Sequence, residues 1–552
     1  MNRDTYAKKA ISQIPRLLGN MDRNPYSRTY GCFHRDYWLD KTSDFPDAVR
    51  QFGAHALALV YKYDFPENIY KNNKKIKDWA VASMIFWSNI QHEDGSFDEF
   101  YPYERGWVGP SAFTAYTTIE TYNILKDEID ENAKQKILNA IKKTAYFIAQ
   151  GEAEEDHLAN HHAMACLALW KAYKLLGDKK LKEAYDKAFT TFKTYHNFTE
   201  GWSREYDGID PGYLSATVSF FGKIYQDNPD PEIKKIIDQS IDACSFFAYP
   251  NGFYAGSLGS RNTLHFYPHG FEIMAKESKI AATVAEKMLI GLSENKLVPP
   301  EIISDRYVFY RVPEFLLSYL DYSERPANLP KLNYEQNNYN NWLPDAKIFI
   351  KNVNNHYVIA NLAKGGVIKI FDLNTNKLIH NDCGIIGRLQ NNKILTSQWI
   401  DTKYEINISD NRFEVSGKLN YVPSNKLFTP FKNIIFRSIM IIFGKSRKLA
   451  HLIKGMIRKN IILKQTKTNI NFKRTFEYKN NEIIIKDEID WQDDSQFDSL
   501  SIGDEFFVRY VPQSRYFQNQ ELSIAGRNIS KTDLEKINKN KKFCESINIK
   551  LL

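Results

Sequence analysis

Three polar residues, an amide followed by two imidazoles, lie near the start of a helix-like segment that covers residues 154–178, "EEDHLANHHAMACLALWKAYKLLGD". The apolar stripe through Trp170 and Leu167, continued back by helical steps, reaches Asn160 and does not avoid it. A polar group buried there needs a partner, which can be a side chain, a water or a substrate. Amides and imidazoles bind acidic groups, so we select Asn160 and His161 as candidate functional residues.

Two further segments carry residues suited to proton transfer and to binding a carboxylate. Tyr213 follows Asp-Pro-Gly at the start of a helix-like segment, Tyr206 lies in the loop before it, and either can act as acid or base. In "SRNTLHFYPHG", Arg261 has a planar fork that suits a carboxylate, and His265 is a candidate general base. Because a proline separates His265 from His269, their spacing does not indicate a helical metal site.

Charged and aromatic residues in the loops are candidates for sugar binding, because aromatic faces are common platforms for sugar rings. They are Asp98, Glu99, Arg105 and Trp107 in "DGSFDEFYPYERGW", Arg204, Glu205 and Tyr206 in "SREYDGID", and His269. The sequence has no GxxxxGK[ST], GxGxxG, HExxH or GxSxG motif, and its basic residues cluster without a nucleic-acid-binding signature. We therefore expect no metal, no cofactor and no nucleic-acid partner.

The composition is that of an ordinary globular protein, with 43% hydrophobic and 25% charged residues among 552. The net charge of +8 suits an acidic polymer or an anionic membrane surface without requiring either. Five widely spaced cysteines without a CxxC pair fit a reducing compartment better than a disulfide framework. The N-terminal residues do not resemble a signal peptide, and no apolar run is long enough for a membrane span. A cytoplasmic location is the expectation.

Apolar residues at spacings of three and four predict helices almost throughout residues 44–321. Besides 154–178, the expected helices cover residues 47–63, 75–91, 110–128, 132–150, 180–196, 211–227, 232–249 and 280–295. The loops on one side are long and rich in aromatic and charged residues, which is typical of functional loops. We expect an N-terminal arm at residues 1–43, followed by an (α/α) toroid, an incomplete helical barrel with a cleft at its decorated end.

A different pattern begins after a linker rich in Pro and Asn at residues 322–345. Residues 346–552 alternate polar and apolar side chains between Asn, Asp and Gly turns, which predicts an antiparallel β-sandwich domain. The fold class is thus multidomain α+β. An insertion at 430–462 is basic and amphipathic, with no acidic residue from Lys432 to Lys459. It is typical of a helix on an anionic membrane surface, although a helix covering a sheet, with its lysines in solvent, gives the same pattern.

This arrangement resembles the heparinase II/III-like and alginate-lyase-like polysaccharide lyases, of the type associated with polysaccharide biosynthesis. The resemblance rests on "NHHAMACLALWKAYKLLG", on "SREYDGIDPGYLSATVSFFGKIY" at the place of the catalytic tyrosine, and on "NLAKGGVIKIFD" at the start of the β domain. The family usually has a histidine after that tyrosine, whereas here Leu214 follows Tyr213. The identity of the base therefore stays open among the tyrosines and histidines.

The resemblance implies β-elimination on a uronic-acid-containing polysaccharide, in capsule, exopolysaccharide or O-antigen metabolism. Asn160 and His161 would neutralise the sugar carboxylate, Arg261 would clamp it, and Tyr213 and His265 would transfer protons. The expected partner is an acidic polysaccharide or a lipid-linked oligosaccharide, met in the cytoplasm or at the inner membrane face, with residues 432–459 in peripheral contact with anionic lipid.

Three alternatives remain open from the sequence. A uronate C5-epimerase shares the proton removal but returns the proton to the other face of the ring. A glycoside hydrolase would use two carboxylates from among Asp98, Glu99, Glu205 and Asp210. A non-catalytic glycan-binding or assembly protein would keep the architecture alone.

Overall fold

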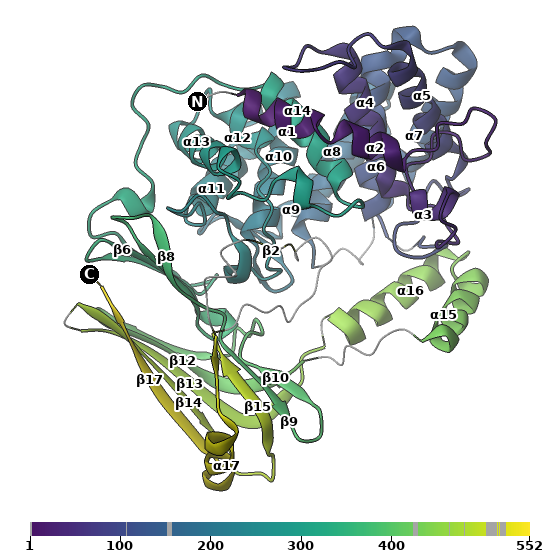
Figure 1. The fold of residues 1–552 in the computed structure, drawn as a ribbon. Coiled ribbons are helices and arrows are strands. Elements are labelled where there is room, and N and C mark those ends of the chain that lie inside the picture. The colour runs from purple at the N-terminus through teal and green to yellow at the C-terminus, as the bar shows by residue number, and fades with distance from the viewer. Residues whose placement is uncertain are drawn as a thin grey trace.

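The computed structural model describes residues 3–105, 107–151, 157–422, 429–462, 464–479, 481–503, 516, 518 and 526–551. Helices form the N-terminal part of the chain and antiparallel sheets the C-terminal part, and the two parts lie against each other (Figure 1). The predicted α+β architecture, a helical toroid followed by antiparallel β structure, is confirmed.

Six of the described helices form the inner ring of the toroid, and each contacts the next around the ring. They are α4 (Gly53–Lys62), α6 (Gly109–Leu125), α8 (Ala159–Leu176), α10 (Pro211–Asp227), α12 (His269–Met274) and α14 (Val308–Leu320). Because α14 also contacts α4, the ring that we expected as an incomplete barrel closes on itself. The first residues of the expected helix 154–178, up to Asp156, lie outside the described residues.

The remaining helices of this part flank the inner ring. They are α1 (Asp4–Ile11), α2 (Ile14–Asn20), α3 (Arg35–Trp38), α5 (Lys74–Asn89), α7 (Glu131–Ala149), α9 (Lys179–Lys193), α11 (Pro231–Ser245) and α13 (Lys279–Ser293). Residues 1–43, expected as an arm, contribute α1, which packs against α13 and α14. Carboxylate and hydroxyl N-caps set several helix starts, because Asp130, Asp178, Asp230 and Ser278 each accept a backbone hydrogen bond from the first turn.

The described residues form three antiparallel sheets. A small sheet within the helical part contains β1 (His196–Asn197), β2 (Trp202–Glu205) and β3 (Gly208–Ile209). A five-stranded sheet contains β4 (Asn340–Leu343), β5 (Ile348–Val353), β6 (His356–Asn361), β7 (Val367–Asp372) and β8 (Lys377–Asp382). The third sheet contains β9 (Ile385–Leu389), β10 (Ile394–Thr396), β11 (Glu405–Ser409), β12 (Arg412–Tyr421), β13 (Lys467–Lys479), β14 (Glu482–Asp490), β15 (Phe497–Ile502), β16 (Arg527–Asn528) and β17 (Lys542–Lys550). Helix α17 (Lys531–Asn540) packs against β15 and β17.

Successive side chains of the five-stranded sheet point to opposite faces, which explains how the helical part and the β part of the chain meet. In β5, Ile348 and Ile350 belong to the core of the toroid, whereas Phe349 belongs to the core between the two large sheets. Successive side chains of a strand point to opposite faces, so this sheet is buried on both sides. Phe349 packs 4.5 Å from Phe413 of the other sheet, measured between ring centroids, which makes the β part a sandwich.

One lysine of the β part forms hydrogen bonds to a loop of the toroid. Lys364, which is 2% exposed, donates to the carbonyl oxygens of Ser257 and Gly259 at 2.6 and 2.8 Å and to Asn262 Oδ1 at 2.5 Å. Nearby, Asn361 Nδ2 donates to the Leu258 carbonyl oxygen at 2.7 Å. These bonds fix the loop of residues 256–262, which carries one of the candidate functional residues.

The basic insertion forms two helices, α15 (Pro430–Phe443) and α16 (Arg447–Ile457), followed by a short π-helix at Arg458–Ile462. Neither helix covers a sheet, because α16 crosses from the β part to the loops of the toroid and α15 lies at the periphery (Figure 1). None of the helices in the described part of the chain combines the length and hydrophobicity that a bilayer crossing needs.

Candidate active site

A cavity of about 270 Å³ lies where the loops of the toroid meet the end of α16. This volume is close to the lower end of the range of small-ligand sites, about 300 Å³. Seven predicted residues line it, namely Glu99, Trp107, Asn160, His161, Tyr206, Tyr213 and Arg261. They come from separate loops and helices, so only the tertiary structure brings them together.

Asn160 lies in the first turn of α8 and is tied to Glu205 at the end of β2. The backbone N–H and the side-chain Nδ2 of Asn160 both donate to Glu205 Oε1, at 2.7 and 2.8 Å. Both side chains are only 1% exposed. The amide oxygen of Asn160 has no hydrogen-bond partner among the described residues, so the cavity wall holds a polar atom that a bound sugar can satisfy.

Arg261 binds the other oxygen of the same carboxylate. Its Nη1 donates to Glu205 Oε2 at 2.9 Å, and its backbone N–H donates to Asp210 Oδ2 at 2.8 Å. The guanidinium lies 3.9 Å from the ring centroid of Tyr213 and 4.8 Å from that of Tyr206. Its Nε is buried without a partner in the described part of the chain. The side chain can therefore donate a further, charge-assisted bond to an acidic ligand.

Asp210 joins the Arg261 loop to the helix that carries Tyr213. Its Oδ1 accepts from the Tyr213 N–H at 3.1 Å, which caps α10, while Oδ2 holds the Arg261 backbone. Burial raises the pKa of Tyr213 well above its ordinary value, although the nearby guanidinium opposes the shift. Burial also raises the pKa of Glu205, against the opposing effects of Arg261 and Asn160. Tyr213 is therefore held as a protonated phenol.

Tyr206 occupies a tight turn between β2 and β3. It has a positive φ of 48°, and Asp207 after it has a φ of 74°. Non-glycine residues in this region cost free energy and persist where the surrounding structure holds them, often at functional sites. Here the N–H of Tyr206 donates to the His157 carbonyl oxygen at 2.9 Å, and the ring lies under the guanidinium of Arg261.

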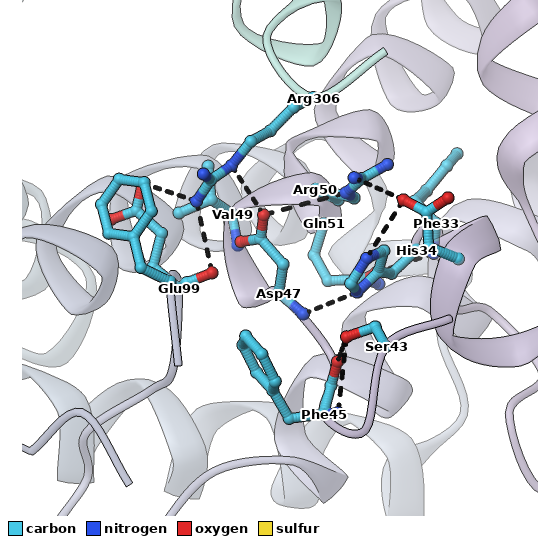
Figure 2. Close-up of polar contacts among 12 residues, drawn as sticks. Phe33, His34, Ser43, Phe45, Asp47, Val49, Arg50, Gln51, Glu99 and Arg306 are labelled. Carbon is cyan, nitrogen blue, oxygen red and sulfur yellow. Dashed lines mark hydrogen bonds and ion pairs between the residues drawn. The ribbon is translucent and has the colours of Figure 1, made fainter. Parts of the chain in front are cut away.

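Glu99 lines the cavity, and Arg306 links it to Asp47, as Figure 2 shows. Arg306 Nε lies 2.9 Å from Asp47 Oδ2, and its Nη2 donates to Glu99 Oε1 at 3.1 Å. Burial raises the pKa of Glu99 to about 8, with Arg306 opposing the shift. Because Asp47 also pairs with Arg306, a protonated Glu99 does not leave this guanidinium without a carboxylate partner.

Trp107 forms an aromatic platform, but part of it is already covered. His161 stacks on Trp107 with 5.3 Å between ring centroids, and Lys454 Nζ from α16 lies 3.4 Å from the Trp107 ring centroid. Lys454 also donates to Glu104 Oε1 at 2.7 Å. The close approach of His161 requires glycine at position 109, because a Cβ there would lie 2.8 Å from its Cε1.

Six predicted residues do not line the cavity. Glu205 does not line the cavity, but it accepts hydrogen bonds from Asn160 and Arg261, which do. Asp98 accepts from the Glu104 N–H at 2.7 Å and lies 2.8 Å from His92. Arg105 donates to the Lys445 carbonyl oxygen at 3.0 Å, so it holds the turn between α15 and α16 and does not line the cavity.

The other three residues are Arg204, His265 and His269. Arg204 stacks on Tyr195, with 5.0 Å between the guanidinium carbon and the ring centroid. His265 is 1% exposed, and burial, with Arg311 nearby, holds its pKa well below the ordinary value. His269 Nε2 lies 2.7 Å from Asp321 Oδ2. Each of these polar side chains has a local partner or lies outside the cavity, so the structure does not support a direct catalytic role for His265.

Residues that were not predicted complete the cavity. Tyr267, Tyr307 and Tyr310 contribute rings, and Lys454 and Arg458 contribute cations from the insertion. The aromatic and basic run "RYVFYR" at 306–311 was a usable signal for α14, but nothing in the sequence indicated that the insertion would reach the toroid. Among the described residues, no group of His, Cys, Asp and Glu is arranged to hold a metal ion.

Comparisons with known proteins agree with this architecture. Residues 66–287 match the family model of the ulvan lyase N-terminal domain. A search of proteins of curated function finds no match. Among solved structures, a Paenibacillus xanthan lyase is similar with a TM-score of 0.53 and 10% identity, over 90% of this chain and 46% of that one. The Streptomyces coelicolor chondroitin AC lyase, in complex with chondroitin sulphate, gives a TM-score of 0.54 and 8% identity, over 90% and 67% of the two chains.

The chain therefore has the fold of the polysaccharide lyases that join a helical toroid to antiparallel sheets, as its sequence predicted. It spans about half the length of the xanthan lyase that it matches. At 8–10% identity the solved structures support the fold alone.

Proposed function

We propose that this protein is a polysaccharide lyase that cleaves a uronic-acid-containing polymer by β-elimination. The observation that supports this most is the convergence of Asn160, Tyr213 and Arg261 on one cavity, with a buried guanidinium nitrogen that has no partner among the described residues. An amide, a phenol and a guanidinium are the groups that this reaction needs around one acidic sugar ring.

In the proposed mechanism, Arg261 Nε and the second N–H of the Asn160 amide donate to the sugar carboxylate and stabilise the negative charge that develops next to C5. His161, the imidazole that lines the cavity, removes the C5 proton, because a ring nitrogen can accept a proton directly whereas a tyrosine must first ionise. The C5–H electrons form the C4–C5 double bond as the C4–O bond breaks. Tyr213, kept protonated by burial, donates its proton to the departing oxygen.

The geometry favours this function over hydrolysis. A glycosidase needs two carboxyl groups on either side of the scissile bond. Of the four carboxylates considered, only Glu99 lines the cavity, while Asp98, Glu205 and Asp210 are held by neighbouring side-chain or backbone groups. No observation singles out the epimerase or the purely glycan-binding alternative.

The proposal extends to the setting of the reaction. The polymer belongs to capsule, exopolysaccharide or O-antigen metabolism, free or lipid-linked, and the protein works in the cytoplasm at the inner membrane face. Two observations support this: all five cysteines are free thiols, four of them buried, as in reducing compartments, and residues 432–459 carry exposed apolar and basic side chains.

The test is to incubate the purified protein with ulvan, xanthan, chondroitin sulphate and acidic capsular polysaccharides and to follow ultraviolet absorbance. A lyase gives a rise from the conjugated double bond; a hydrolase gives new reducing ends without it; an epimerase gives neither but exchanges the C5 proton with deuterated water. Asn160→Ala should abolish the rise, and His162→Ala is the matched control because His162 stacks on Tyr195, with 4.5 Å between ring centroids. Binding to an acidic polymer without any of these products would contradict the proposal.

A further inference from the structure

The hairpin of α15 and α16, residues 430–457, turns its basic side chains toward the protein at several points. Arg437 forms an ion pair with Asp44 at 3.2 Å, and Arg447 lies over the ring of Phe147 at 4.4 Å. Gly444 packs so closely that a Cβ there would lie 2.7 Å from Tyr103 Cβ. The hairpin is therefore docked on the toroid through one side.

The other side of the hairpin is apolar and exposed. Of the twenty large hydrophobic side chains that are exposed in the described part of the chain, ten lie in these two helices. Phe431, Ile434 and Ile442 are 72%, 65% and 66% exposed, and Leu452 is 57% exposed. Within α15, the spacing of Phe431, Ile434 and Ile442 places these three on one stripe, and Leu452 belongs to α16. Soluble proteins rarely expose such a patch unless it meets another surface.

The charge around this patch indicates what that surface is. Lys432, Lys445, Lys448 and Lys459 are exposed, and no acidic residue occurs between Lys432 and Lys459. A second copy of the chain, related by a twofold axis, would place one lysine-bearing patch against another of the same charge. An anionic lipid surface instead pairs the lysines with headgroups and buries the apolar stripe at the interface.

We propose that the outer face of this hairpin docks on an anionic lipid bilayer. The opposite side of α16 provides Lys454 to the cavity wall, so docking holds the candidate active site next to the membrane surface. Docking itself does not depend on the proposed lyase activity. The consequence for catalysis does depend on that activity: the enzyme would meet its acidic saccharide as a membrane-anchored chain.

Vesicle co-sedimentation tests the docking with the full-length protein. We expect binding to vesicles of equimolar phosphatidylcholine and phosphatidylglycerol and little binding to phosphatidylcholine alone. The triple variant Ile434→Ser, Ile442→Ser, Leu452→Ser should lose at least about tenfold in affinity. The control triple Ile69→Ser, Ile379→Ser, Ile408→Ser removes isoleucines that are 80%, 41% and 39% exposed outside the hairpin, and should bind as the wild type does.

A second experiment tests the roles of charge and of self-association. Lys432→Gln with Lys448→Gln should weaken binding to the anionic vesicles and reduce its dependence on salt. The proposal is overturned if anionic vesicles do not bind, if both triple variants bind equally, or if sedimentation reveals a dimer that the hairpin triple variant abolishes. Unchanged thermal unfolding of the variants shows that a loss of binding is not a loss of fold.

Discussion

The guanidinium of Arg261 lies 3.9 Å from the ring centroid of Tyr213, and Asp210 holds both residues by their backbones. A cation over a phenol ring stabilises the phenolate, but here burial outweighs that effect and raises the pKa of Tyr213. The same guanidinium bonds Glu205, which in turn bonds Asn160. The candidate site is thus one connected network instead of three independent side chains.

The first prediction concerns the phenol group of Tyr213. Tyr213→Phe removes only the hydroxyl group and keeps the cap at the Tyr213 N–H, so the fold should persist while the elimination rate falls by about 10²–10⁴. Tyr206→Phe is the matched control, since it removes the same atom from the neighbouring ring beneath Arg261. Turnover with saturating polymer measures both. A larger loss for Tyr206→Phe would transfer the proton-donating role to Tyr206.

The second prediction concerns the buried ion pair. Arg261→Met leaves the Glu205 carboxylate buried without its cation, which should cost roughly 3–5 kcal/mol of unfolding free energy and abolish activity. The double variant Arg261→Met, Glu205→Gln removes both charges and should recover most of that stability without recovering activity. Chemical denaturation together with the absorbance assay separates the two effects. If the double variant regained activity, Arg261 would not be the carboxylate ligand.

The third prediction is a pH dependence from Glu99. Its folded-state pKa is raised to about 8, so between the ordinary carboxyl range and pH 8 the folded state holds a proton that the unfolded state has lost. Stability from this group is therefore fullest at acidic pH and is lost as pH rises to about 8, by roughly 2–4 kcal/mol.

Glu99→Gln tests this because the amide mimics the protonated acid. The variant should match the wild type near pH 5 and unfold at a higher temperature than the wild type at pH 9. Asp98→Asn, one residue away, provides a control outside the cavity. Parallel melting curves for wild type and Glu99→Gln at every pH would exclude the raised pKa.

The fourth prediction concerns the lysine that fastens the Arg261 loop. Lys364→Met removes three buried hydrogen bonds to residues 257–262 and should lower kcat/KM by about tenfold or more, since small displacements of a binding group reduce rate strongly. Lys369→Met is the control: Lys369 is also buried, 4% exposed, but donates to Asn381 at 2.6 Å within the sheet. Both variants should lose about 1–3 kcal/mol of stability, and only Lys364→Met should lose activity.

Local patterns predicted much of the fold. The 3.6-residue period predicted the long helices of the toroid other than α14, and alternation between turn residues after position 346 predicted the antiparallel strands of the β part. Short elements such as β1, β9, β10 and β16 were missed, because two to five residues hold too few side chains to establish a period. The closure of the ring by α14 and α4 depends on contacts between residues about 250 positions apart, which periodicity does not record.

The sequence by itself determined which chemical groups were available: Asn160 at the start of a helix, Tyr213 after its Asp-Pro-Gly cap, and Arg261 in an aromatic loop. Only the tertiary structure decided which of them share a cavity, since it brought in Glu99 and Lys454 and turned Asp98, Arg105 and His265 toward other partners or positions. The physical reason is that a local pattern fixes the face of an element on which a side chain lies. The partner across that face depends on how distant elements pack, and that is a property of the whole chain.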